Sequence, residues 1–324
     1  MKTKTKIGIL LVSMLLLSLS TLQVAHAASG DSTGTAHVLS AEPTLSNPQL
    51  LTTSNSDVNN TGLTVNGNTE YWCNFTISHG SELSYLKNVT IRIWDSALTG
   101  ENDADFIYQH YSYTWVESTD TWSCLNGAGY IVEANCSDPG AASSLTTYEF
   151  RLAFKLSKIA RYAATPNWKI TIFVWDDATP NNEDVDRSLV FGANFYSEIT
   201  ITDTTHEWTG LLPSTSVNVT VDSAPVDFTV LANGQYDIQC MGNASLTKGS
   251  DTIPLSNLRF YGADTLTSSS IMTTEYQNVG ALQDQAACTT ETPVNHGIYL
   301  WLTVPDGTPP GDYVYKLSTQ IISG

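Results

Sequence analysis

Basic residues are scarce in this sequence, with 14 Lys and Arg against 32 Asp and Glu in 324 residues. A net charge of −18 argues against nucleic acid and anionic lipid as partners, because both select basic surfaces. The HExxH, CxxC, P-loop and GxGxxG patterns are also absent, and the GxSxG match at residues 30–34 lies in the polar segment after the predicted signal peptide rather than between a strand and a helix. Without these zinc, hydrolase and nucleotide-binding signatures, we expect a protein that is not an enzyme. The least favoured alternative is a glycan-active hydrolase, since any acidic chain offers paired carboxylates.

Long apolar runs are lacking except near the start of the chain. Residues 7–17 are apolar, follow Lys2, Lys4 and Lys6, and precede Ala25-His26-Ala27, which matches the small-x-small pattern of signal peptidase sites. The run is too short to span a bilayer comfortably. We therefore predict a cleaved signal peptide over residues 1–27, a secreted or cell-surface location, and no membrane-spanning segment in the mature chain. Cleavage removes three of the 14 basic residues and no acidic ones, which leaves a charge of about −21.

The remaining composition is that of a folded, β-rich protein, since 14% of residues are charged and 41% are hydrophobic. Short segments rich in β-branched and aromatic residues alternate with Gly, Asn, Asp and Pro. We predict an all-β fold of two immunoglobulin-like antiparallel β-sandwich domains. The predicted strands are 70–78, 88–94, 109–116, 147–156, 168–176, 190–202, 217–221, 226–232, 236–240, 253–261, 296–304 and 312–322.

The alternation breaks near residues 204–213, where the sequence THEWTGLLP occurs. We place a domain boundary there, with one sandwich over 61–204 and the other over 205–324. Residues 28–60 are expected to form a flexible segment that could include a first strand. Only 156–164 is expected to be helical, as a turn or two between strands.

Six Asn-x-Ser/Thr triplets are N-glycosylation acceptors, more than we expect by chance. In KNVTIRIWD, the apolar residues 89, 91 and 93 share one face of a strand, so Asn88 points away from the core. Asn74 and Asn218 have the same phase in EYWCNFTIS and SVNVTV, and we expect glycan on these three outward asparagines. The six acceptors are Asn59, Asn74, Asn88, Asn135, Asn218 and Asn243.

The positions that point outward along these strands also include four aromatic residues, Trp72, Trp94, Phe173 and Trp175. If their strands are neighbours, the rings form an exposed patch that could stack on sugars or receive a partner protein. The alternative is that they pack under a loop or against the second domain.

Two loops dense in Asp, Asn and Glu offer oxygen ligands for calcium. Neither has the glycine-centred spacing of calcium-binding loops, so a solvated acidic turn is favoured, and no other cofactor is expected. The candidate ligands are Asp103, Asp105, Asp176, Asp177, Asp184 and Asp186.

The five cysteines would form disulfides readily after export. We predict that Cys124 and Cys136 close a short loop and that Cys240 and Cys288 link the C-terminal half. Cys73 is then left over, and we interpret it as a small buried hydrophobe. An intermolecular bridge, or a pairing with Cys124 or Cys136, is the alternative.

Several stretches resemble known surface proteins. VPDGTPPGDYVYKLSTQI is similar to the last hairpin of many secreted immunoglobulin-like domains. KNVTIRIWD, YTWVESTDTWSC and WKITIFVWDD resemble repeated β-sandwich domains in secreted or cell-envelope proteins of archaea, particularly methanogens. The resemblance implies an extracellular, often glycosylated protein with a structural or adhesive role, and it carries over no catalytic residues.

We therefore expect a non-enzymatic, secreted structural or interaction component of a cell envelope or extracellular assembly, with other envelope proteins or glycans as partners. The alternative function is a carbohydrate-binding or adhesive module that uses the aromatic residues named above.

Overall fold

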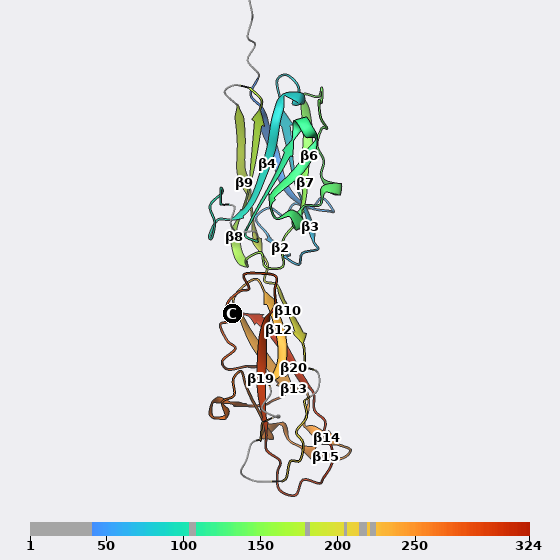
Figure 1. Cartoon of the computed structure of the whole chain (residues 1–324), viewed down its shortest axis with the longest axis vertical. Coiled ribbons are helices and arrows are strands. Elements are labelled where there is room, and N and C mark those ends of the chain that lie inside the picture. Colours follow the sequence, from blue (N-terminus) through green and yellow to red (C-terminus); the bar gives the residue numbers. More distant parts are fainter. Residues whose placement is uncertain (1–40, 104–107, 179–181, 204–205, 214–218, 221–224) are drawn as a thin grey trace, which may run out of the picture. The chain divides into compact units, whose positions relative to one another are not determined.

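The computed structural model describes residues 41–103, 108–178, 182–203, 206–213, 219–220 and 225–324. The predicted signal peptide, Asp105 and Asn218 lie outside these ranges. The described residues form β-strands connected by turns and short 3-10 helices, without an α-helix among them (Figure 1). Almost all strand pairs are antiparallel, and β2 with β9 is the parallel exception. The predicted all-β fold of antiparallel sandwiches is confirmed.

Strands β1 to β9 form two sheets. One has the order β1-β3-β7 and the other has the order β2-β9-β8-β4-β5-β6. The strands are β1 (Thr44–Thr52), β2 (Gly62–Leu63), β3 (Glu70–Ser78), β4 (Leu86–Asp95), β5 (His110–Val116), β6 (Thr121–Asn126), β7 (Thr147–Lys155), β8 (Ala163–Asp176) and β9 (Glu183–Ala193). The 3-10 helices between them are η1 (Leu83–Tyr85), η2 (Glu117–Thr119), η3 (Ala128–Tyr130) and η4 (Glu133–Asn135).

A single hydrophobic cluster fills the space between these two sheets. Its side chains come from alternate positions of β3 and β7 on one side and of β4, β5 and β8 on the other, as the period of two in a strand requires. Aromatic rings from both sheets meet in it. Phe150 stacks on Phe75 with ring centroids 5.6 Å apart and receives the edge of Trp115 at 5.3 Å. These contacts fix which face of each sheet remains outside.

The remaining strands form further sheets, with the orders β10-β12-β19-β16-β17, β18-β13-β20 and β14-β15, while β11 pairs with β19. They are β10 (Ser197–Ile201), β11 (Val219–Thr220), β12 (Val226–Ala232), β13 (Tyr236–Gly242), β14 (Leu246–Lys248), β15 (Asp251–Ile253), β16 (Leu258–Tyr261), β17 (Ser270–Ile271), β18 (Gln277–Asn278), β19 (Val294–Leu302) and β20 (Leu317–Ser323), with η5 (Leu255–Asn257) and η6 (Leu266–Ser268). A second cluster, centred on Phe228, Ile238 and Phe260, fills their core.

Several predicted elements differ from the structure. The helix predicted over 156–164 is wrong, because the chain makes a turn there and β8 begins at Ala163. The single strand predicted over 190–202 is divided into β9 and β10, and β10 pairs with β12. The strand predicted over 253–261 is interrupted by η5. The division into domains at 204 stays a prediction.

Membrane-spanning helices were sought in the described residues only. No helix among them is long and apolar enough to cross a membrane.

Candidate functional site

The outer face of the β2-β9-β8-β4-β5-β6 sheet carries three of the four aromatic residues predicted to point outward. We call Arg92, Trp94, Lys169, Phe173, Trp175 and Arg187 the β8 face. Trp94 on β4 lies opposite Lys169 on β8, and Arg92 lies opposite Thr171. Thr90 and Asn88 are paired with Phe173 and Trp175. The register therefore places Arg92 on β4 between the row of Trp94 and Lys169 and the row of Phe173.

Cations of the same chain lie over two rings of the β8 face, those of Phe173 and Trp94. The guanidinium carbons of Arg92 and Arg187 lie 4.9 Å and 5.5 Å from the centroid of the Phe173 ring. Trp175 stacks on Phe173 at 5.2 Å, with the two ring planes 6° apart. Lys169 Nζ lies 5.3 Å from the Trp94 ring centroid. As a result Phe173 is only 8% exposed, although it points away from the core.

Glu101 holds the two arginines in place. Its carboxylate forms an ion pair with Arg187 at 2.9 Å, and its carbonyl oxygen accepts a hydrogen bond from Arg92 at 3.3 Å. Burial raises the pKa of Glu101, but the Arg187 hydrogen bond and neighbouring positive charge outweigh it and hold the pKa below its ordinary value. Phe173 thus lies beneath side chains that are themselves fixed.

Trp72 lies on the other sheet, so the predicted four-residue patch is wrong. β3 pairs with β1 and β7 and with none of the strands of the β8 face. The alternation of residues along a strand predicts which face of its sheet a residue occupies. It does not predict which sheet the strand belongs to. We call the outward side chains of Glu70, Trp72, Asn74, Glu149 and Arg151 the β3 face.

Hydrogen bonds and one cation–π contact connect the β3 face. Arg151 lies over the Trp72 ring at 3.9 Å, and its Nε donates to Asn74 Oδ1 at 3.1 Å. Asn74 Nδ2 donates to Glu149 at 3.1 Å, and Trp72 Nε1 donates to Glu70 at 2.6 Å. A hollow of about 320 Å³ beside these residues is lined by Ser137, Tyr148, Glu149 and Arg151. That volume lies at the lower end of the range for small-molecule sites.

The predicted glycosylation residues differ in exposure. The phase prediction for Asn74 is correct, but the residue is only 4% exposed and both polar atoms of its amide are bonded to neighbours, which argues against the expected glycan there. Asn88 is half-buried, and its Oδ1 is buried without a hydrogen bond from any described residue. Asn59 is also half-buried, whereas Asn135 and Asn243 are exposed.

Several of the predicted calcium ligands accept backbone hydrogen bonds in the structure. Asp176 is fully buried and accepts the backbone N–H groups of Ala178 and Asn182 at 3.1 and 2.8 Å. Asp184 accepts the N–H of Leu45 at 2.6 Å. Within the described ranges, no three His, Cys, Asp or Glu side chains are grouped as a metal ion requires. Calcium binding through Asp103, Asp177 and Asp186 therefore gains no support from their positions.

All five cysteines are free thiols in the structure, so the two predicted disulfides, Cys124–Cys136 and Cys240–Cys288, are wrong. Cys124 Sγ donates to the carbonyl of Asn126 at 2.8 Å, whereas Cys136 lies against Ala153. Cys240 belongs to the C-terminal core, and Cys288 packs in a separate cluster with Leu231. The interpretation of Cys73 as a buried hydrophobe is confirmed, since it is 0% exposed.

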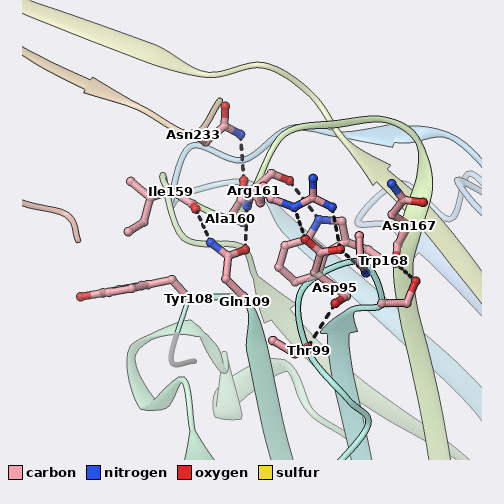
Figure 2. Close-up of polar contacts among 12 residues, drawn as sticks. Asp95, Thr99, Tyr108, Gln109, Ile159, Ala160, Arg161, Asn167, Trp168 and Asn233 are labelled. Atoms are coloured by element: carbon pink, nitrogen blue, oxygen red, sulfur yellow. Dashed lines mark hydrogen bonds and ion pairs between the residues drawn. The ribbon is translucent and has the colours of Figure 1, made fainter. Parts of the chain in front are cut away.

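The structure also contains a partly buried polar network that the sequence did not indicate (Figure 2). Arg161 donates from Nε and Nη2 to the two carboxylate oxygens of Asp95, which is 0% exposed. The Gln109 carboxamide accepts from Arg161 N at 2.9 Å and donates to the Ile159 carbonyl at 3.1 Å. Asn233 donates to the Ala160 carbonyl at 2.8 Å. These bonds occupy the backbone groups that a helix over 156–164 would need.

Comparisons with known proteins give no family for this chain. No family model matches the sequence, and no curated protein matches it. Among solved structures, a crystal structure of a variant of BcpA, the major pilin subunit of Bacillus cereus, has 8% identity and a TM-score of 0.31, and the match covers 91% of this chain and 72% of that one. A structure designated BspA_C_mut has 9% identity and a TM-score of 0.22, with 87% and 95% covered. The functional proposal therefore rests on the chain's own residues.

Proposed function

We propose that this protein is a non-enzymatic, exported structural or interaction component of a cell envelope or extracellular assembly. The composition and the predicted signal peptide support an extracellular location. The packing of the β8 face supports a structural role over a sugar-binding one.

The observation that carries this choice is the covering of Phe173 by Arg92 and Arg187. A ring that stacks on a sugar needs one open face. Phe173 is 8% exposed and is flanked by two guanidinium groups and Trp175, so a sugar would first have to displace the chain's own cations. Each guanidinium–ring contact instead contributes about 0.5–1 kcal/mol to a fixed outer surface.

The alternative, a carbohydrate-binding module, is favoured by a different observation. The hollow beside Trp72 is lined by polar side chains that could exchange hydrogen bonds with sugar hydroxyl groups. In this form the module would use the β3 face and leave out Trp94, Phe173 and Trp175.

The test is isolation of the protein from the cells that make it, under native conditions and after mild chemical cross-linking. A structural component should be recovered in cross-links to envelope proteins or to further copies of itself. Recovery of an uncross-linked monomer that is retained on an immobilised polysaccharide would support the alternative instead.

A further inference from the structure

The exposed acceptor Asn135 lies directly over the β3 face. It is the last residue of η4, and the segment that contains it runs beside β7. Val132 N donates to the Ala153 carbonyl at 2.8 Å, and Ser137 N donates to the Arg151 carbonyl at 2.9 Å. These bonds carry the Asn135 side chain across β7 as far as β3.

The amide nitrogen of Asn135 is already oriented by a carboxylate. Nδ2 lies 2.9 Å from both oxygens of Glu70, and Trp72 Nε1 donates to one of them, Oε1, at 2.6 Å. A glycosylated amide keeps one N–H, which can still donate to Glu70. The contact that positions Nδ2 therefore survives the modification.

Hydrogen-bonding capacity remains beside this nitrogen. Arg151 is held by Asn74 through Nε and by the Trp72 ring, and its terminal nitrogens donate to no acceptor among the described residues. Arg151 lines the hollow of about 320 Å³ together with Ser137, the hydroxyl residue of the Asn135 acceptor triplet. Guanidinium donors, a hydroxyl group and the Glu149 carboxylate suit the hydroxyl groups of a pyranose.

We propose that Asn135 is N-glycosylated and that the first sugar rests on a seat formed by Glu70, Trp72, Glu149 and Arg151. Asn74 stays unmodified, because its amide is buried in the wall of that seat. The proposal rests on the export contained in the proposed function.

The covalent step needs a donor that the secretory machinery supplies, an oligosaccharide linked through phosphate to a polyprenyl lipid. The bond from sugar C1 to the phosphate oxygen breaks, and a bond from C1 to Asn135 Nδ2 forms. The lipid phosphate leaves, and the amide loses one proton.

Asn243 provides a matched control on the same chain. It is also exposed, and its Oδ1 accepts from Ser318 at 3.0 Å, but no carboxylate among the described residues holds its nitrogen. A glycan on Asn243 would have no seat of this kind. Removal of this glycan should therefore leave the stability of the fold unchanged.

Peptide-level mass spectrometry of protein from its native source tests the modification itself. We expect glycan on Asn135, no glycan on Asn74 and a processed N-terminus. A processed chain with bare Asn135, or with glycan on Asn74, overturns this inference and leaves export standing. An unprocessed chain without glycan overturns both the inference and the proposed location.

Thermal unfolding of the glycosylated and glycan-free chains tests the seat. Asn135→Gln should lower the unfolding temperature more in the glycosylated protein than in the glycan-free one, whereas Asn243→Gln should show no such difference. Arg151→Lys keeps the charge but loses the paired donors, so it should remove most of the glycan-dependent stabilisation. An equal effect of Asn135→Gln on both forms would show that the sugar makes no contact with the seat.

Discussion

Arg161 and Asp95 form a bidentate ion pair in which the carboxylate is completely buried, with Arg161 Nη2 2.9 Å from Asp95 Oδ1. Ala97 N also donates to the same oxygen, at 3.0 Å. The pair joins the end of β4 to the segment that precedes β8, and the Asp95 hydrogen bond raises the pKa of Arg161. A charge buried in this way is costly to leave without its partner.

Arg161→Met should therefore destabilise the fold by about 3–5 kcal/mol, because the Asp95 carboxylate would remain buried and unpaired. Urea unfolding followed by circular dichroism measures this loss. Arg187→Met is the matched control, since Arg187 is 55% exposed, and its ion pair with Glu101 and its contact with the Phe173 ring each contribute at most about 1 kcal/mol. Equal losses in the two variants would show that Asp95 is not buried as described.

Phe173→Ala should cost about 3 kcal/mol, although residue 173 points away from the core, because the ring is almost fully enclosed by Arg92, Arg187 and Trp175. Guanidinium chloride unfolding gives the value. Leu125→Ala serves as the control, since Leu125 is 78% exposed and its loss should lie within about 0.5 kcal/mol. An unchanged stability of Phe173→Ala, together with lost polysaccharide binding, would instead favour an open sugar-binding platform.

The number of free thiols can be counted directly by alkylation. Denatured, unreduced protein should take up iodoacetamide at all five cysteines, whereas two disulfides would leave only Cys73 to react. In the native state Cys124 should react before Cys136, since burial raises the pKa of Cys136 to about 11 and thiolate is the reactive form. Cys73, Cys240 and Cys288 are buried and should react only after unfolding. Fast native labelling of Cys240 would contradict this order.

Asp120→Asn should raise stability at neutral pH by about 0.5–1 kcal/mol. Burial, and then the neighbouring Asp120, raise the pKa of Asp138. A carboxyl group whose folded pKa is raised stabilises the fold below its unfolded pKa, and this contribution is lost as pH rises through the folded pKa. The gain should therefore be present at neutral pH and vanish near pH ~3, where both states are protonated. Urea unfolding at the two pH values measures it, and an equal gain at both would contradict the electrostatic cause.

Local alternation was sufficient to predict most strands of the first two sheets. β3 has the bounds predicted for it, because Tyr71, Cys73, Phe75 and Ile77 alternate with polar residues and all four are buried. The six-residue β6 was missed, since its partly buried Trp122 and Cys124 alternate with exposed residues that include Leu125. Short strands of this kind depend on pairing with a neighbour, here β5, more than on their own pattern.

The candidate sites were less accessible to sequence reasoning, because they depend on contacts between distant residues. Asp95 and Arg161 are 66 positions apart, and no local pattern connects them. Phase placed Trp72 on an outer face correctly, but strand order alone decides that Arg151 covers it and that Phe173 lies on another sheet. The burial of Asn74 likewise follows from its neighbours on β7, Glu149 and Arg151.

The most direct test of the proposed function is labelling of intact producing cells with a biotin reagent that does not cross membranes, followed by fractionation and detection of this chain. An exported envelope or extracellular component should be labelled without lysis and should be recovered with the envelope or with assemblies larger than one chain. Labelling only after lysis, with the chain found as a free monomer inside the cell, would contradict the account.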